Sequence, residues 1–557
     1  MLAHIVDPLN RRIFDGDVIV TDGIISSITP CPVPDDAPYM LPGFVDSHIH
    51  IESTLLTPDH FARLAVPHGT LAVVTDPHEI ANVSGSEGIQ FMLDRAQLVR
   101  FHFSFGVPSC VPSTSPAIES SGANIDLSDV ERYLSMPPFY GLAEMMNYPG
   151  ILSGDPIPCE KVKATLRAGK VVDGHAPGLT GEEARSYVQV GISTDHEIYD
   201  IQHARERIAL GQKILIREGS AARNFDELIP LVDDPANVGM LMFCTDDIYP
   251  DELLQGHINL LVKRAVSRHP ESLDHLWNVL HAACVAPVQH YHLPVGLLQP
   301  GQSADFILVS DLVNFQVLQT WISGHKVFFS GQIDIDNPSA INLAQHPATL
   351  PDTMAVSPLS VDSIAHPVPT SPIPVIVSCE DQLLTDTLLA MPKVEGSNAV
   401  SDPDRDILKI VVLRRHDNNL LAQPPAVGFI HGFGLKRGAI ASTIAHDCHN
   451  IIAVGVSDQD IVQAINQLIK IRGGLCVVDG QNSDSLQLQC GGLMSDHPGS
   501  QVAQAHLRLK QKAHQLGCPY SAPFMTLAFM ALPVIPKLKI TDRGLFDVTK
   551  FQFVTPE

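Results

Sequence analysis

The sequence lacks several features that mark whole classes of protein. None of its ten cysteines belongs to a Cys-x-x-Cys pair, so we expect reduced and mostly buried thiols. No segment reaches the ~18 uninterrupted apolar residues of a membrane helix, and we expect no membrane partner. The first segment, "MLAHIVDPLNRRIF", has acids and arginines where a secretory signal has an unbroken apolar run. These absences together favour a cytoplasmic protein.

Positive charge is also scarce. Lysine and arginine number 36 against 61 aspartates and glutamates, which gives a formal net charge of -25. Because such a chain has no basic excess with which to displace counterions, we expect no nucleic-acid partner. The composition, 45% hydrophobic and 17% charged, is that of a globular protein, and the charge suits a small neutral or cationic substrate.

The length of 557 residues is too great for one ordinary core and predicts two to four structural units. Eight apolar, strand-like runs recur through residues 42–295, with helix-compatible stretches between them. The runs are "GFVDSHIH", "TLAVVTDPHE", "FHFSFGVPS", "YGLAEMMN", "KVVDGHAPG", "GISTDHE", "KILIREGS" and "MLMFCTDD". Their number and near-uniform apolarity are typical of the buried parallel strands of a (β/α)8 barrel.

The two flanks of this region have a different, β-rich pattern. Residues 1–41 contain short β-like runs separated by Asp-Gly turns, and a similar texture returns in residues 296–345. Residues 346–374 are rich in Pro, Ser and Thr and are predicted to be a linker. Residues 375–557 then form a C-terminal α/β domain, in which Ser457 is expected to cap a helix.

Histidines and acids gather at the carboxyl ends of the predicted strands, where barrel enzymes carry their function. His48 and His50 share one strand, and residues i and i+2 of a strand point to the same side, so both imidazoles can face the barrel axis. Further strand ends carry His78, Glu79, Glu144, His175, His196 and Asp246. Such a mixed nitrogen and oxygen set suits zinc, manganese or iron.

Each of these residues has a plainer explanation when it is taken alone. A single His-x-His is usually structural, His175 or His196 could be a hydrogen-bonded turn histidine, and Glu144 could cap a helix. Asp246 and Asp247 could be acids at a helix N-terminus, where the dipole favours them. The joint placement at one end of successive strands favours a metal site.

A zinc deaminase of the cytidine type is the first alternative. Its signature is His-x-Glu followed by Pro-Cys-x-x-Cys, and His50-Ile51-Glu52 matches the first half. The second half is missing, because Pro158-Cys159 continues as Glu-Lys-Val. The match is therefore incidental to a different metal architecture.

Longer motifs carry a family resemblance. "PGFVDSHIHIES" resembles the first-strand signature of the amidohydrolase superfamily, and the two β-rich flanks resemble the composite β-sandwich of many members. "HIHIEST", "VVTDPHEIANVSG", "GLAEMMNYPG", "DGHAPGLTG" and "CTDD" are similar to the bacterial adenine deaminase family. So are the C-terminal "ASTIAHDCHNIIAVG", "GGLMSD" and "PFMTLAFMALPVIPKLKITDRGLFDV". The resemblance covers nearly the whole chain.

The resemblance implies hydrolytic deamination of adenine to hypoxanthine and ammonia, as in purine salvage, by a metal-bound hydroxide at a binuclear centre. Two divalent ions are implied, manganese or iron, with zinc as an alternative. His48 and His50 would bind one ion, His175 and His196 the other. Glu144 would bridge them, and Asp246 would complete the first site and move protons. A homodimer is also implied.

The remaining catalytic groups stay open at this stage. The leaving ammonia and the ring nitrogen beside C6 each need a proton, and a carboxylate such as Asp246 can shuttle one of them. Glu52, Glu79 or His78 could supply the other, and we expect Glu52 or Glu79 to meet the purine edge. Asp247 is a further candidate for substrate binding.

The C-terminal His446, Asp447 and His449 allow two interpretations. They could be satisfied polar residues of a core, or they could bind substrate if this domain folds over the barrel mouth. Two other functions also remain: a cyclic-amide hydrolase of dihydroorotase or hydantoinase type, and a non-catalytic barrel. Glu144 in place of a bridging lysine argues against the first, and the intact ligand set argues against the second.

Overall fold

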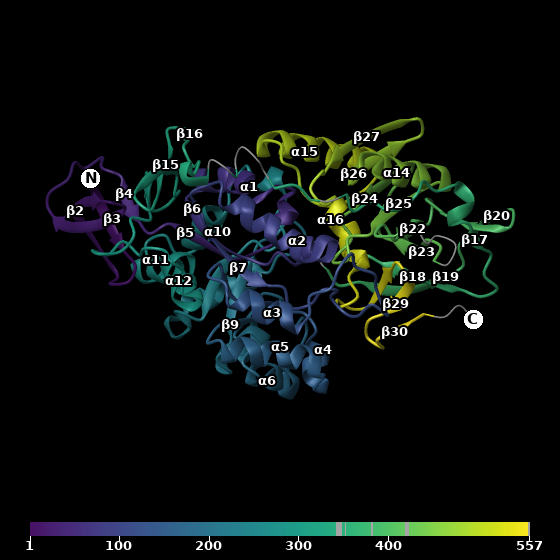
Figure 1. Ribbon diagram of the computed structural model, residues 1–557, viewed down its shortest axis with the longest axis horizontal. Coiled ribbons are helices and arrows are strands. Elements are labelled where there is room, and N and C mark those ends of the chain that lie inside the picture. The colour runs from purple at the N-terminus through teal and green to yellow at the C-terminus, as the bar shows by residue number, and fades with distance from the viewer. Residues whose placement is uncertain (341–342, 344–347, 351, 380–382, 418–422, 555–557) are drawn as a thin grey trace.

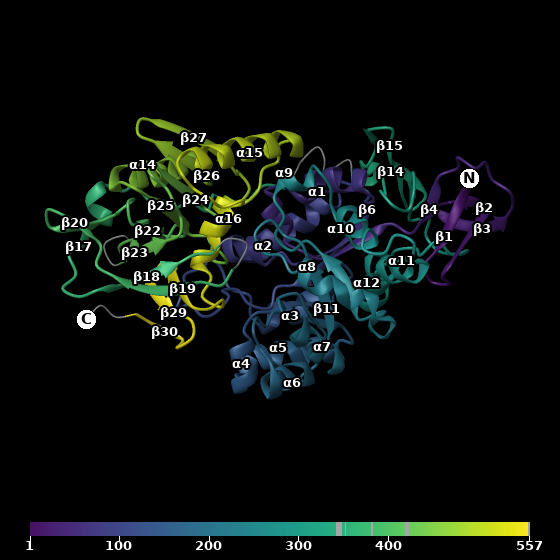
Figure 2. The same ribbon diagram turned by 180° about the vertical axis from the view of Figure 1, so that it is seen from behind.

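The computed structural model describes residues 1–340, 343, 348–350, 352–379, 383–417 and 423–554. Three regions follow one another along its longest axis (Figure 1). The N-terminal strands lie at one end, a barrel occupies the middle, and a C-terminal sheet with its helices lies at the other end. Figure 2 shows the same order from behind, with the two chain termini far apart.

The middle region is a barrel of parallel strands. One sheet contains β5 (Phe44–Ile49), β6 (Thr70–Thr75), β7 (His102–Val107), β8 (Phe139–Met145) and β9 (Val171–Gly174), and a second contains β10 (Thr194–Asp195), β11 (Lys213–Arg217) and β12 (Leu241–Cys244). Between the two sheets, Ser193 N donates to Val172 O at 2.8 Å. The eight strands coincide with the eight predicted runs, so the predicted (β/α)8 barrel is confirmed.

The barrel closes between its first and last strands. Asp246 N donates to His48 O at 2.9 Å, and His50 N donates to Asp246 O at 3.1 Å. Asp46 adds a side-chain connection, because its Oδ1 accepts from Thr245 N at 3.1 Å. Closure therefore joins β5 directly to the residues that follow β12.

Helices cover the outside of the barrel, between successive strands and after the last one. They include α1 (Pro58–Ala65), α2 (His78–Ala96), α3 (Leu127–Leu134), α5 (Pro156–Arg167), α6 (Gly181–Gln189), α7 (Ile201–Ala209) and α10 (Ile258–Val266). α3 shows why such a helix forms where it does. Asp126 and Asp129 make a reciprocal capping box at its start, and the helix buries Val130, Tyr133 and Leu134. No helix of the described residues is long and apolar enough to cross a bilayer.

The two β-rich flanks meet in one sheet. Its strand order is β16-β15-β14-β13-β4-β1-β2-β3, with β1–β4 from residues 2–41 and β13–β16 from residues 306–333. The junction is the antiparallel pair of β4 (Tyr39–Leu41) and β13 (Phe306–Val309), in which Leu41 lies opposite Ile307. The chain therefore enters and leaves the barrel through adjacent strands.

The C-terminal region has a mixed sheet whose strand order is β19 (Asp386–Ala390), β18 (Ile373–Val377), β23 (Ala426–His431), β22 (Ile407–Leu413), β25 (Ile451–Gly455), β24 (Ala439–Ser442), β26 (Gly474–Asp479) and β27 (Asn482–Gln487). α14 (Asp458–Ile471) packs on one face, and its predicted cap is confirmed, because Ser457 Oγ accepts from Asp460 N at 3.1 Å. α16 (Pro523–Ala528) contacts the same sheet through β24 (Ala439–Ser442) and β25 (Ile451–Gly455), and its buried residues belong to the core shared with the barrel.

Part of the predicted linker packs against this C-terminal core. Met354, Val356, Leu359 and Ile364 are buried with the residues of α14. Residues 346–347 and 351 of that segment lie outside the described residues. Residues 354–364 of the predicted linker are therefore part of the packed C-terminal core.

The loop between β7 and α3 connects the barrel to the C-terminal region. Asn450 Nδ2 donates to Ser120 O at 3.0 Å, and Ser120 N donates to Asp542 Oδ1 at 2.9 Å. Thr541 Oγ1 donates to Ile118 O at 2.9 Å. These bonds are buried, so they hold the C-terminal region at a fixed place beside the barrel mouth.

Asp46→Asn is expected to destabilise the barrel. The buried Asp46 also accepts from Thr245 Oγ1 at 2.5 Å and lies 3.0 Å from His257 Nε2, and an amide would place a donor against donors. We expect a loss of about 2–4 kcal/mol and a fall in apparent Tm of several degrees, measured by thermal denaturation. Asp15→Asn, at a half-exposed carboxylate paired with His4, is the matched control and should change Tm little. Equal Tm values for the two variants would contradict the role of Asp46.

Candidate metal centre and substrate pocket

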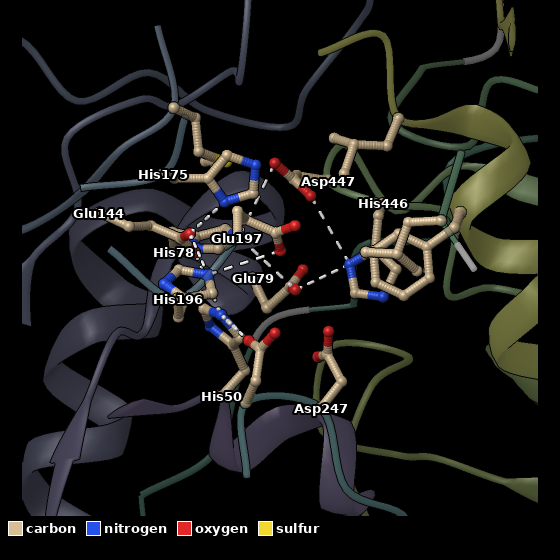
Figure 3. Close-up of a pocket in the computed structure, with 15 residues that line it drawn as sticks. His50, His78, Glu79, Glu144, His175, His196, Glu197, Asp247, His446 and Asp447 are labelled. Atoms are coloured by element: carbon tan, nitrogen blue, oxygen red, sulfur yellow. Dashed lines mark hydrogen bonds and ion pairs between the residues drawn. The ribbon is translucent and has the colours of Figure 1, made fainter. Parts of the chain in front are cut away.

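A small pocket lies at the carboxyl ends of the barrel strands. Most of its polar lining comes from the barrel, and the C-terminal region adds polar and apolar residues on the other side (Figure 3). The lining residues are His50, His78, Glu79, Glu144, Met146, His175, His196, Glu197, Asp246, Asp247, Leu383, His446, Asp447, Phe529 and Leu532.

His48 and His50 bring two imidazoles together at the end of β5. Their Nε2 atoms lie 3.2 Å apart, while the intervening Ile49 is buried in the hydrophobic core. Asp246 Oδ1 lies 3.4 Å from His48 Nε2 and 3.2 Å from His50 Nε2. The barrel-closing main-chain bonds thus hold three donor atoms around one point. Asp246 adopts φ +56°, a left-handed conformation uncommon outside glycine and typical of functional positions.

Glu144, at the end of β8, divides its two oxygens between two pairs of histidines. Oε1 lies 3.1 Å from His50 Nε2 and 3.9 Å from His48 Nε2. Oε2 lies 2.6 Å from His175 Nδ1 and 3.2 Å from His196 Nε2. A carboxylate placed in this way can bridge two cations.

The donor set fits divalent cations. Ligands bonded to one such ion at ~2.0–2.2 Å lie about 3.0–3.6 Å from each other, which is the spacing of most of these atoms. His175 Nε2 has no hydrogen-bond partner among the described residues, although His175 is almost fully buried. Several triplets could hold an ion: His48, His50 and Asp246; His48, Glu144 and His196; His175, His196 and Glu197. The residues present can therefore hold divalent metal.

Neighbouring groups orient these donors. His50 Nδ1 lies 3.1 Å from Asp76 O, and an N–H at Nδ1 leaves Nε2 free for a cation. Arg217, at the end of β11, donates to Asp246 Oδ2 at 2.5 Å and also contacts Glu197. Burial opposes ionisation of Asp246, but Arg217 and His196 outweigh it and hold the pKa of Asp246 well below its ordinary value.

A second cluster of polar side chains faces this donor set. His446 Nδ1 lies 2.8 Å from Glu79 Oε1, and His449 contacts Oε2 of the same carboxylate. Burial raises the pKa of Glu79, but His446 and His449 have the larger combined effect and keep that pKa well below its ordinary value. His78 Nε2 lies 3.5 Å from Glu79 Oε1 and 3.8 Å from Asp447 Oδ2. Two distant parts of the chain thus share one buried charge network, drawn in Figure 3.

Asp247 lies beside Asp246 and lines the same pocket. Ser53 Oγ donates to Asp247 Oδ1 at 2.5 Å. Burial and the neighbouring Asp246 raise the pKa of Asp247 to about 6. Adjacent carboxylates therefore differ in protonation tendency: Asp246 stays ionised, whereas Asp247 can take up a proton close to neutral pH.

Apolar side chains complete the pocket on the C-terminal side. Leu383, Phe529 and Leu532 line it, and each is buried. The Phe529 ring stacks on the His446 imidazole, with centroids 4.4 Å apart and planes at 13°. A flat apolar surface therefore stands opposite the charged barrel mouth.

Besides the metal donor His48, two candidate residues from the sequence lie outside this lining. Glu52 is buried in the short helix η1 (Ile51–Thr54), where its Oε1 accepts from Ile80 N at 3.2 Å. His449 lies behind Glu79 and contacts it there. Burial raises the pKa of Glu52 to about 7. Glu52 supports the pocket through its contact with α2, and His449 supports it through Glu79. Glu79 is the acid that faces the pocket.

The sequence analysis missed several residues of the site. Glu197 directly follows His196, and Arg217 ends an apolar strand, so the strand-end signal could have identified both. Asp76 directly follows β6, so the same signal could have identified it; its main-chain oxygen lies 3.1 Å from His50 Nδ1 and its Oδ2 lies 2.9 Å from His78 Nδ1. Phe529 and Leu383 lie in the C-terminal region, where apolar residues are indistinguishable from core residues by sequence.

Comparisons with known proteins show which families this chain resembles. Residues 39–327 match the Amidohydrolase family, and residues 382–552 match the Adenine deaminase C-terminal domain. The chain is 47% identical to an adenine deaminase of Methanosarcina mazei, over 99% of this chain and 98% of the relative. It is 43% identical to an adenine deaminase of Salinibacter ruber, again over 99% and 98% of the two chains. The similarity thus extends through both the barrel and the C-terminal region.

Substitution of Glu144 should have a larger effect on metal content than substitution of a single histidine. We expect about two divalent ions per wild-type chain, about one in His175→Ala, and nearly none in Glu144→Ala, because only Glu144 faces both histidine pairs. Elemental analysis after manganese loading measures these values. Glu119→Gln changes a buried carboxylate that accepts from Ser113 Oγ, outside the donor set, and should leave metal content unchanged. Wild-type metal content in Glu144→Ala would overturn the bridging assignment.

Proposed function

The chain belongs to the adenine deaminase family of amidohydrolases, and we propose that the residues around the barrel mouth deaminate adenine to hypoxanthine and ammonia. The observation that carries this assignment of residues is the placement of the two Glu144 carboxylate oxygens, each beside a different histidine pair. Its Oε1 faces His50 and its Oε2 faces His196, at 3.1 and 3.2 Å. The same mouth is covered by the C-terminal region that matches adenine deaminases.

We assign two divalent ions to this mouth. His48, His50 and Asp246 would hold the first ion, His175 and His196 the second, and Glu144 both. When bound, such ions supply Lewis acidity, which lets water act as a nucleophile at neutral pH. Imidazole and carboxylate donors suit manganese or iron, and zinc is also compatible with them.

The reaction replaces the C6 amino group of adenine by oxygen. A bond forms between C6 and the water oxygen, the C6–N bond breaks, and the amine leaves as ammonia. One proton of the water goes to the departing amine, and the other ends on the ring nitrogen beside C6. Two proton transfers are therefore required, and each needs a positioned acid or base.

Asp246 and Glu79 are the groups we assign to these transfers. Asp246 keeps Oδ1 toward His48 and His50 while Arg217 holds Oδ2, so Oδ1 is placed to receive a proton from water and return it to the amine. Glu79 lines the pocket as an ionised carboxylate between two histidines. For the second transfer it would take up a proton and pass it to the ring nitrogen beside C6.

The C-terminal region would hold the ring itself. Phe529, Leu383 and Leu532 offer apolar contact to the faces or edges of a purine. His446, Asp447, Asp247 and His78 surround that surface with hydrogen-bonding groups. Enclosure by both regions removes water from the ring, which strengthens each of these polar contacts.

We retain a homodimer and a cytoplasmic location as proposals from the sequence.

Substrate turnover tests the function directly. Protein loaded with manganese should release ammonia from adenine and form hypoxanthine, whereas adenosine, guanine and dihydroorotate should react far more slowly or not at all. Ammonia detection together with the ultraviolet change of the purine measures this. Removal of metal by a chelator should abolish turnover, and re-addition of manganese should restore it. Turnover of dihydroorotate without turnover of adenine would instead establish a cyclic-amide hydrolase.

Glutamine variants should separate the two candidate acids. Glu79→Gln removes a carboxylate that faces the pocket, and we expect kcat/KM for adenine to fall by at least ~10². Glu52→Gln keeps an oxygen that can accept from Ile80 N, and we expect a loss below about tenfold. Metal content of both variants should match the wild type. A larger loss in Glu52→Gln than in Glu79→Gln would transfer the catalytic role to Glu52.

A further inference from the structure

Lys539 is a fully buried lysine in β28 (Leu538–Thr541) of the C-terminal region. Its Nζ donates to Leu383 O at 2.8 Å and to Phe529 O at 3.0 Å. No carboxylate forms an ion pair with it among the residues that the structure describes. Burial accordingly lowers the pKa of Lys539 to about 7. Burial of a lysine amine is costly, so packing alone does not account for a lysine at this position.

The two carbonyls that Lys539 binds belong to residues of the pocket. Leu383 and Phe529 line it from the C-terminal side, and they come from distant segments of the chain. Phe529 also stacks on His446, which contacts Glu79. The ammonium group therefore lies directly behind the apolar surface that faces the metal centre.

A neighbouring residue reinforces the same connection. Thr385 N donates to Pro536 O at 2.9 Å, and Thr385 Oγ1 donates to Leu538 O at 2.9 Å. These bonds tie the segment that carries Leu383 to the start of the strand that carries Lys539. Hydrogen bonds to the main-chain carbonyls of Pro536 and Leu538 thus fix the segment that follows residue 383.

We propose that Lys539 is a positioning residue for adenine binding, which ties the main chain at Leu383 to that at Phe529 and so sets the apolar surface for the purine ring. This inference rests on the proposed function. Lys539 touches neither the reacting atoms nor the metal donors in this arrangement. Its effect passes through Leu383 and Phe529 to the position of the ring.

The role has a specific kinetic consequence. Leu383 and Phe529 contact the ring in the substrate and in the transition state alike, so weakening them removes uniform binding. KM then rises, whereas kcat changes little. Substitution of a lysine that served only the fold would instead lower thermal stability and leave KM unchanged.

The chain offers a matched control in Lys409. This lysine is also fully buried and lies in the C-terminal sheet, where Nζ donates to Ile364 O at 3.2 Å and pairs with Asp458. Neither partner lines the pocket. Lys409→Met therefore reproduces the loss of a buried ammonium group without any change at the purine surface.

The experiment compares Lys539→Met, Lys409→Met and wild type as full-length, manganese-loaded protein. Steady-state kinetics with adenine, metal content and thermal denaturation are measured for all three. We expect KM to rise at least tenfold in Lys539→Met with kcat within about threefold of wild type, and KM to stay within twofold in Lys409→Met. An unchanged KM in Lys539→Met, or an equal rise in Lys409→Met, would overturn the proposal.

A second variant covers the case in which Lys539→Met fails to fold. Thr385→Val removes the hydroxyl bond to Leu538 O and preserves shape, and we expect a KM rise of several-fold with kcat retained. A KM equal to that of wild type in Thr385→Val would then count against the proposal. Wild-type kinetics separate this test from the proposed function. If wild type does not turn over adenine, the proposed function is wrong. If wild type turns over adenine normally and the variants have an unchanged KM, only the positioning role is rejected.

Discussion

Closure of the barrel between β5 and the end of β12 is the constraint on which the site depends. Two main-chain hydrogen bonds join Asp246 to His48 and His50, so the same contacts that complete the sheet also bring three donor side chains to one point. Asp46 strengthens this seam from within the strand. A metal centre built on closing strands is held by the whole barrel, which gives it the precision that loops alone lack.

The donor set is unfavourable for the protein when it is considered without cations. Glu144 and Asp246 are buried carboxylates, and the imidazole nitrogens around them stand at distances where protons would have to be shared. Buried charges are costly unless they are paired or coordinate metal. Arg217 offsets part of this cost at Asp246, and divalent cations offset the rest. Without cations, the buried carboxylates at the barrel mouth are therefore electrostatically unfavourable. Arg217, which contacts Asp246 and Glu197, lowers this cost.

The barrel part of this site was largely predictable from sequence, whereas in the C-terminal part the sequence indicated only His446, Asp447 and His449. The i, i+2 spacing of His48 and His50 and the parallel strand ends place side chains at one edge by local geometry alone. Glu197, which directly follows His196, and Arg217, which ends β11, lie at strand ends and follow the same rule. The positions of Phe529 and Lys539 depend on packing between distant segments, which periodicity does not encode.

The two regions contribute different physical properties to one pocket. The barrel supplies rigid, charged groups whose positions follow from strand geometry, and the C-terminal region supplies an apolar surface and a second charged cluster. Because Glu79 on α2 is paired with His446, the barrel acid is oriented by the same segment that stacks on Phe529. Orientation of the acid and enclosure of the ring are therefore coupled, and a chain that kept only the barrel would leave Glu79 without the partners that fix both its position and its charge.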